Sequence, residues 1–218
     1  MSLVCKLISP ALLHFGTNYV SDIMFNHGEM MPDLWVFGYG SLMWRPGFPV
    51  KAQYAARLYG YHRSFCVFSH VHRGTPEKPG LVFGLDRGGA CRGLAFQVDT
   101  AHADATRQYL MEREQVTSVY LDVVRRVRLL GGATQADALA DAEDGIPREV
   151  DALCFVVDRQ HPQYAGKLSF ERQVDLITHG EGQSGKNPEY LHNTVAHLDE
   201  MGIGDVGLRR LWHAVERR

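Results

Sequence analysis

The hydrophobic pattern of the chain changes near Ser169, from segments typical of strands to segments typical of helices. Before that residue, short runs rich in Val, Phe, Tyr and Leu alternate with turns that contain glycine or proline. The segments that we expect to be strands are Leu34–Tyr39, Gln53–Ser69, Leu81–Leu85, Cys91–Val98, Val119–Leu130 and Ala152–Val157. We expect the second of them to form one or two strands, and the third and fourth to pair as a hairpin around Asp86-Arg87-Gly88-Gly89.

Helical spacing occurs once early in the chain and dominates its last third. Asp99 or Thr100 can cap a helix that runs to about Glu114. After Ser169, apolar residues recur every three or four positions, as on one face of a helix. They are Phe170, Val174 and Ile177, then Tyr190, Leu191, Val195 and Leu198, then Val206, Leu208, Leu211 and Val215. This pattern predicts an α+β domain with a curled or closed sheet.

Two segments fall outside this pattern. Residues 1–33 are expected to be an N-terminal appendage, with amphipathic spacing over Cys5–His27. Its first residues, Met1-Ser2-Leu3, resemble those that a cloning vector adds. Gly131–Pro147 is rich in Ala, Asp and Gly and is expected to be an excursion between strands. The rest of residues 34–218 has a length that suits one domain.

The composition argues against a nucleic-acid-binding protein and against a membrane protein. The net charge of −2 argues against a general attraction to nucleic acid or to an anionic membrane. No stretch approaches the roughly 20 apolar residues of a membrane span. The four cysteines form no C-x-x-C pair, which favours reduced thiols in the cytoplasm. We therefore expect a cytoplasmic protein without nucleic-acid or membrane partners, and the sequence leaves its oligomeric state open.

The first candidate site is a glycine turn that ends the first strand, Phe37-Gly38-Tyr39-Gly40-Ser41-Leu42. Backbone N–H groups in such a turn can point at one centre and form an anion nest or an oxyanion hole; a plain turn is the alternative. It is not a G-x-S-x-G nucleophile elbow, because Tyr39 and Met43 occupy the glycine positions. A hydrolase that uses Ser41 and a histidine stays an alternative hypothesis, although the sequence around Ser41 lacks the nucleophile elbow of such enzymes.

Two charged segments are further candidates. Glu112 and Glu114 lie two residues apart near the end of the early helix, so they point to different sides and at most one can enter a given pocket. The proline loop His72–Gly80 contains Arg73, whose guanidinium could bind a carboxylate through two parallel hydrogen bonds. A charged surface loop is the alternative for the second segment.

Gly180–Asn187 matches the phosphate-binding pattern G-x-x-x-x-G-K until its last position. Asn187 stands where a hydroxyl residue would hold magnesium, and the preceding segment has helical rather than strand spacing. We interpret it as a glycine-rich connection between helices, with Pro188 near the start of the second, and expect no nucleotide there. His70 and His72 would share one face of a strand, but no H-E-x-x-H motif occurs and we expect no metal site.

The order of these motifs resembles that of the ChaC-type γ-glutamylcyclotransferases, which act on glutathione. The resemblance runs from about Trp35 to Val215 and is carried by Trp35–Trp44, His72–Gly80, Arg113-Glu114, Ser184–Asn187 and Glu189-Tyr190-Leu191. The chain departs from the family pattern at Ser118-Val119, where a glycine pair usually precedes the tyrosine. It also departs at Cys66-Val67-Phe68, where a polar stretch with a tryptophan is usual.

The resemblance implies a compact mixed β-barrel with surrounding helices, formed by residues 34–218. It implies a carbon–nitrogen lyase that cyclises the γ-glutamyl group of glutathione and releases 5-oxoproline and Cys-Gly, without metal or organic cofactor. Glu114 would move the protons, and the substrate would contact Tyr39, Gly40, Ser41, Leu42, Arg73 and Tyr190. Two alternatives stay open: a cyclotransferase for other γ-glutamyl amines, and a non-catalytic regulatory or binding protein, which would not need Glu114.

Overall fold

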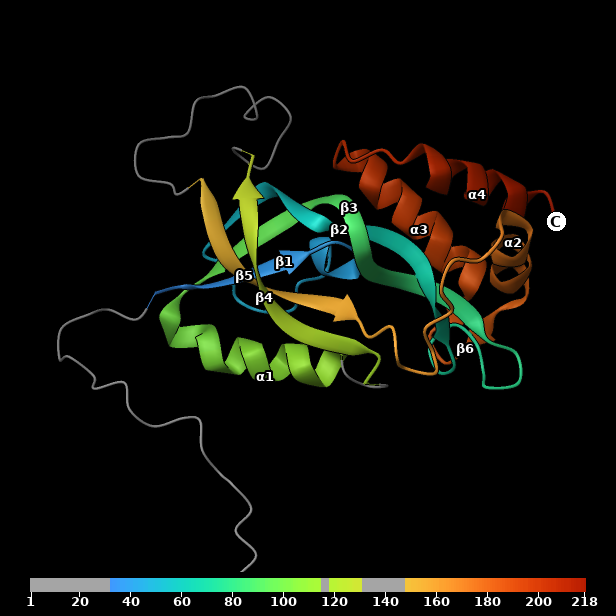
Figure 1. The fold of residues 1–218 in the computed structure, drawn as a ribbon, viewed down its shortest axis with the longest axis horizontal. Helices are drawn as coiled ribbons and strands as arrows, with labels where there is room; N and C mark the ends of the chain where they lie inside the picture. The colour runs from blue at the N-terminus through green and yellow to red at the C-terminus, as the bar shows by residue number, and fades with distance from the viewer. Residues whose placement is uncertain (1–31, 115–117, 131–147) are drawn as a thin grey trace, which may run out of the picture. The chain divides into compact units, whose positions relative to one another are not determined.

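Five strands close into a barrel, and helices pack on its outside (Figure 1). The computed structural model describes residues 32–114, 118–130 and 148–218 of the chain. The strands are β1 (Leu34–Gly38), β2 (Ala52–Ser69), β3 (Gly80–Val98), β4 (Tyr120–Leu129) and β5 (Glu149–Val157), in the spatial order β1-β3-β2-β4-β5. β1 pairs antiparallel with β3 and parallel with β5, and the parallel contact closes the barrel. The predicted α+β fold with a mixed barrel is confirmed.

The two longest strands correct one sequence prediction. β2 and β3 are antiparallel neighbours from Ala52, opposite Gln97, to Ser69, opposite Gly80. The hairpin expected within residues 81–98 is therefore wrong, because the chain continues through this region as one strand. Gly88 has a φ of 105° and the adjoining Gly89 a φ of 68°, and the pairing with β2 shifts at this point. The glycine pair thus makes a bulge instead of a turn, in a backbone region that suits glycine.

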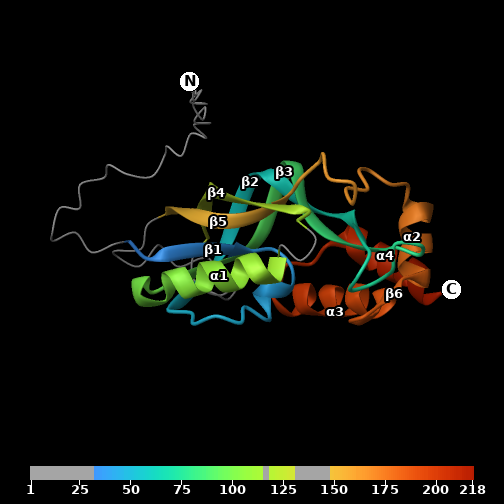
Figure 2. The same ribbon diagram turned by 90° about the horizontal axis from the view of Figure 1, so that it is seen from below.

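The early helix, α1 (Ala103–Glu114), lies along the β1 side of the barrel (Figure 2). A short 3-10 turn leads into it, and the carboxylate of Asp99 accepts a hydrogen bond of 2.9 Å from the N–H of Ala101. This confirms the predicted cap. Leu110 of α1 is fully buried in an apolar cluster with residues of β1, β3 and β5, which anchors the helix on the barrel.

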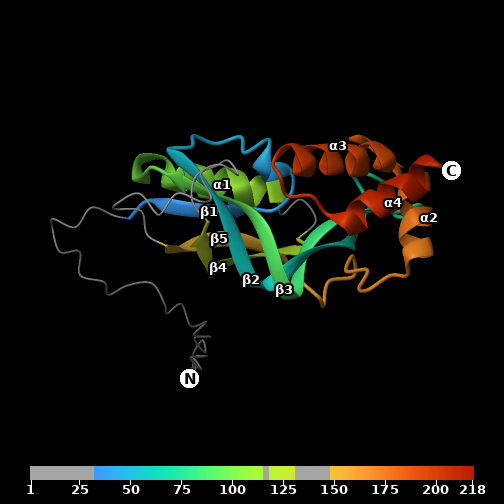
Figure 3. The same ribbon diagram turned by 90° about the horizontal axis from the view of Figure 1, so that it is seen from above.

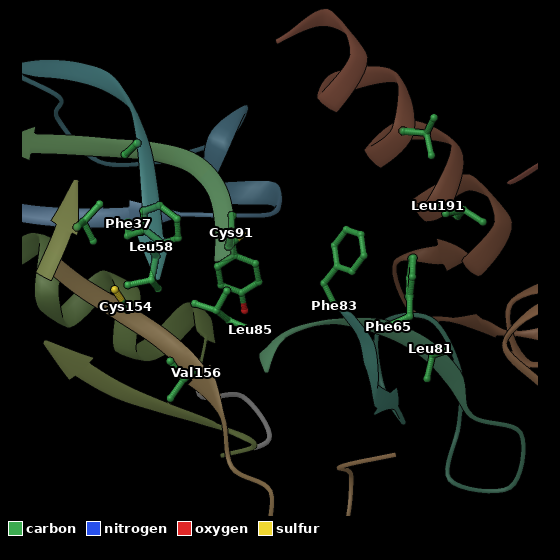
Figure 4. Close-up of a cluster of buried hydrophobic side chains, with 14 of the residues drawn as sticks. Phe37, Leu58, Phe65, Leu81, Phe83, Leu85, Cys91, Cys154, Val156 and Leu191 are labelled. Atoms are coloured by element: carbon green, nitrogen blue, oxygen red, sulfur yellow. The ribbon is translucent and has the colours of Figure 1, made fainter. Parts of the chain in front are cut away.

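The predicted helical C-terminal third consists of α2 (Phe170–His179), α3 (Asn187–Glu200) and α4 (Val206–Glu216). These three helices gather at one end of the barrel (Figure 3). Leu191 of α3 joins the cluster that contains Phe65 of β2 and Phe83 of β3, so the helices and the barrel share a core (Figure 4). Inside the barrel, Leu58 and Val156 belong to the same cluster.

Two sequence predictions lie wholly or largely outside the described residues. They are the appendage, of which only residues 32 and 33 are described, and the excursion Gly131–Pro147. Among the helices of the described ranges, none combines the length and the apolar character that crossing a bilayer requires.

Candidate active site

A cavity of about 450 Å³ is bordered by the end of β1, the end of α1, the proline loop and α3. All the site residues that the sequence singled out line this cavity: Tyr39, Gly40, Ser41, Leu42, Arg73, Glu114 and Tyr190. They come from four separate parts of the chain, which the fold brings to one place. Their chemical roles stay predictions.

The glycine turn contributes backbone donors to the cavity. Ser41–Met43 form one turn of 3-10 helix, in which the N–H of Met43 donates to the carbonyl of Gly40 at 2.9 Å. The N–H groups of Ser41 and Leu42 begin this turn and therefore have no acceptor inside it. The side chain of Leu42 is buried in the apolar core, so its backbone is the part that a ligand can use. The turn is thus suited to an anionic or carbonyl oxygen.

Glu114 is the last residue of α1, and its side chain is only 19% exposed. Burial raises the pKa of its carboxyl, and the nearby Arg113 guanidinium offsets part of this rise. A carboxyl of this kind can both accept and donate a proton closer to neutral pH than an exposed glutamate can. Glu112, in contrast, is exposed, accepts a hydrogen bond from Gln108 at 3.0 Å and does not line the cavity. The expected separation of the two carboxylates is confirmed.

Three tyrosines, Tyr39, Tyr120 and Tyr190, line the cavity together with Glu114. Burial is the main cause that raises the pKa of each phenol, to about 12 for Tyr190 and well above the ordinary value for Tyr39 and Tyr120. All three therefore stay neutral hydroxyl groups. Tyr120 donates to the carbonyl of Phe83 and was missed as a site residue by the sequence analysis. The feature of the sequence that could have identified Tyr120 as a site residue is its position shortly after Glu114, near the start of a predicted strand.

The proline loop and the segment Gly180–Asn187 form one wall of the cavity. The N–H of Gln183 donates to the carbonyl of Val71 at 2.9 Å, and the N–H of Ser184 donates to the carbonyl of His72 at 3.0 Å. The guanidinium of Arg73 donates to the carbonyl of Lys186 at 3.2 Å. Its carbon also lies 5.5 Å from the ring centre of Tyr190. Arg73 is therefore held by the wall and by α3 together.

These contacts explain Gly182, which lies within the segment that resembles a phosphate-binding loop. A Cβ atom on Gly182 would lie 2.4 Å from the carbonyl oxygen of Val71, so only glycine allows the two segments to approach this closely. The segment follows α2, not a strand, and contains the two-residue strands β6 (Glu181–Gly182) and β7 (Gly185–Lys186). Our interpretation as a connection between helices is confirmed, and Pro188 lies in the first turn of α3.

The contacts of Ser41 bear on the hydrolase hypothesis. Its Oγ accepts a hydrogen bond of 3.0 Å from Nη2 of Arg113. No histidine of the described ranges makes a hydrogen bond to it, so the Ser–His pair of that hypothesis is not formed there. In the same part of the chain, no cluster of three or more His, Cys, Asp or Glu side chains could hold a metal ion.

Residues 34–218 match the model of the family described as ChaC-like protein. The chain belongs to the ChaC-like family. One relative of this ChaC-like chain is the glutathione-specific gamma-glutamylcyclotransferase of Escherichia coli (strain K12). It is 31% identical over 184 residues, which cover 84% of this chain and 73% of the relative. Glutathione-specific gamma-glutamylcyclotransferase 1 of Danio rerio is 34% identical over 160 residues, which cover 72% of this chain and 75% of the relative.

The fold of this ChaC-like chain also matches a solved structure. The crystal structure of the selenomethionine-labelled yeast γ-glutamyl cyclotransferase specific to glutathione has a TM-score of 0.73 to it. The match covers 86% of this chain and 97% of the yeast chain, with 24% sequence identity. The γ-glutamylcyclotransferase-like barrel that the motif order implied is therefore confirmed.

Proposed function

We propose that this ChaC-like protein cyclises the γ-glutamyl group of glutathione and releases 5-oxoproline and Cys-Gly. The observation that carries the proposal is the position of Glu114, a largely buried carboxyl that lines the same cavity as the N–H groups of Ser41 and Leu42. The names of the curated relatives support glutathione as the substrate. A cavity of about 450 Å³ has room for a tripeptide of this size.

The reaction joins two atoms of one substrate molecule. The α-amino nitrogen of the glutamyl group forms a bond to its own γ-carbonyl carbon, and the amide bond from that carbon to the cysteine nitrogen breaks. The attacking amine gives up a proton, and the leaving cysteine amine gains one. Glu114 can perform both transfers in sequence, because a carboxyl with a raised pKa accepts and then donates a proton. Atoms and charge balance without metal or organic cofactor, since proximity supplies much of the effect.

The cavity residues have distinct roles in this scheme. The N–H groups of Ser41 and Leu42 stabilise the negative charge that develops on the γ-carbonyl oxygen. The buried phenols of Tyr39 and Tyr190 shape the space around the glutamyl group and can donate hydrogen bonds. Arg73, at the wall of the cavity, binds the carboxylate at the Cys-Gly end. The fold, the buried free thiols of the described region and the substrate together favour a cytoplasmic enzyme.

The direct test is incubation of the full chain with glutathione and a chelator, followed by detection of both products. We expect 5-oxoproline and Cys-Gly in equal amounts. A parallel panel of γ-glutamyl dipeptides measures the alternative of a broader cyclotransferase, which would process them at comparable rates. If no γ-glutamyl compound yields 5-oxoproline, the proposal is wrong and the non-catalytic alternative takes its place.

Substitution of Gly40 tests the role of the turn. A Cβ atom on Gly40 would have one neighbour within 4 Å, the ring of Phe83 at 4.0 Å, so there is space for a larger side chain beside the residues that line the cavity. We expect Gly40→Val to reduce kcat/KM for glutathione by on the order of 10²-fold, with Gly40→Ala intermediate and the melting temperature of both near that of the wild type. Steady-state kinetics and calorimetry check this. Normal kinetics in Gly40→Val would rule out substrate contact at this turn.

A further inference from the structure

Arg113 lies between the two halves of the candidate site and contacts both. Its Nη2 donates to Oγ of Ser41 in the glycine turn at 3.0 Å, and its Nε lies 3.2 Å from Oε1 of Glu114. We propose that Arg113 is a positioning residue, which joins the substrate-binding turn to the carboxylate so that the two keep one geometry. This inference rests on the proposed function, to which it adds a role that neither the family match nor the relatives' names assign.

The remaining guanidinium contacts fasten the chain that follows the turn. Nη1 of Arg113 donates to the carbonyl of Arg45 at 2.6 Å and to that of Pro46 at 3.2 Å. It also donates to the hydroxyl of Tyr109, one helical turn earlier on α1, at 2.9 Å. A Cβ atom on Gly47 would lie only 2.1 Å from that hydroxyl, so the loop passes directly over Tyr109. The helix end and the loop are thus packed together around one planar cation.

The contact with Ser41 sets the direction of the serine hydroxyl. A hydroxyl has one proton to donate and two lone pairs, whereas a guanidinium can only donate. Ser41 must therefore be the acceptor in this pair, which leaves its own proton free for another partner. Since Ser41 lines the cavity and no other hydrogen bond of this hydroxyl occurs within the described residues, the substrate is the partner that fits. Arg113 thus makes Ser41 a donor toward the substrate.

The contact with Glu114 sets how readily the carboxyl ionises. Burial raises the pKa of Glu114 and the Arg113 cation lowers it, so the two effects oppose each other. Without the cation, the carboxyl would remain protonated to higher pH and would be unable to accept the amine proton there. Lysine could keep the charge. It could not keep the geometry, because its single nitrogen cannot reach the serine hydroxyl and the loop carbonyls together.

Two substitutions separate geometry from charge. We expect Arg113→Lys to lower kcat on glutathione by on the order of 10²-fold, with the acid limb of the pH profile of kcat/KM near its wild-type position. We expect Arg113→Met to lower kcat at least as far and also to move that limb to higher pH. Arg107→Met is the matched control, since Arg107 is an exposed arginine of the same helix. It should leave the kinetics and the pH profile unchanged.

A double-mutant cycle with Ser41→Ala tests the link to the turn. If Arg113 orients Ser41, the alanine substitution should cost much less activity in Arg113→Lys than in the wild type. Independent, additive losses would overturn the inference, as would Arg113→Lys with normal kcat. This cycle needs only the milder Arg113 variant, so it remains decisive even if Arg113→Met fails to fold.

One measurement does not depend on activity. Carbon-13 NMR of labelled glutamate carboxyls, with Glu114→Gln to assign the resonance, gives the pKa of Glu114 in each variant. We expect it to rise in Arg113→Met and to stay close to the wild-type value in Arg113→Lys; an unchanged pKa in a folded Arg113→Met would contradict the coupling. Absence of 5-oxoproline from the wild type would refute the proposed function alone, because this titration still tests the contact between Arg113 and Glu114.

Discussion

Glu114→Gln is expected to lower turnover of glutathione by about 10²–10⁴-fold, the usual contribution of general acid–base catalysis. Glutamine keeps the size of the side chain and can still make hydrogen bonds, but it cannot move a proton. Single-turnover and steady-state assays of 5-oxoproline release measure the loss. Glu112→Gln is the matched control, because Glu112 is exposed on the same helix and lies outside the cavity lining. Near-normal turnover in a folded Glu114→Gln protein would remove Glu114 from the mechanism.

The raised pKa of Glu114 also predicts a pH dependence. As a base, Glu114 must be ionised, so kcat/KM should fall as the pH drops through its pKa, which lies above the ordinary glutamate range. Because the folded state holds the proton more tightly than the unfolded state, ionisation of Glu114 weakens the fold as pH rises through this window. Glu114→Gln removes that penalty. The melting temperature of the variant near neutral pH should therefore be no lower than that of the wild type.

Asn187→Ala is expected to lower the free energy of unfolding by about 2–6 kcal/mol. The buried side-chain amide accepts from the N–H of Leu81 at 2.6 Å and donates to its carbonyl at 2.9 Å. Alanine leaves both backbone groups buried without these partners, and each such loss costs about 1–3 kcal/mol. Asn193→Ala is the control for stability, because Asn193 is an exposed asparagine of the same helix. Within the described residues its side chain makes no hydrogen bond that the substitution would remove.

Denaturant unfolding monitored by circular dichroism measures the difference between these two variants. Asn187 joins α3 to β3 beside the cavity wall, so Asn187→Ala should also weaken glutathione binding and raise KM. A change in unfolding free energy below about 1 kcal/mol would contradict the account, because it would mean that Leu81 finds other partners. In the sequence, Asn187 breaks a phosphate-binding pattern and ends the motif Ser184–Asn187. The structure gives it a packing role.

The hairpin prediction failed for a reason that local sequence does not contain. Asp86-Arg87-Gly88-Gly89 has the composition of a turn, but pairing with β2 over almost the whole of β3 keeps the chain in one strand, with a bulge at the two glycines. Asp86 is buried at this point, where Arg159 donates to it at 2.7 Å and Tyr164 at 2.9 Å. Both partners come from a segment far along the chain. A rule based on four residues cannot include hydrogen bonds of this kind.

The candidate site was predictable where short-range geometry decides. Helical periodicity was enough to separate Glu112 from Glu114, and the order of motifs pointed to Glu114 as the one that matters. The roles of Arg113 and Tyr120 could not be predicted in the same way. Arg113 meets Ser41 and Arg45, and Tyr120 meets Phe83, through contacts between segments that only the closed barrel brings together.

The sequence by itself determined the secondary structure class, the C-terminal helices, a cap at Asp99 or Thr100 and the glycine turn after β1. Each of these depends on residues within a few positions of one another. Only the tertiary structure decided that β3 is a single bulged strand. It also decided that Gly182 is required by the approach of Val71, and that Arg113 joins the turn to Glu114. These features depend on contacts between distant segments, and the position of such segments follows from how the whole core packs.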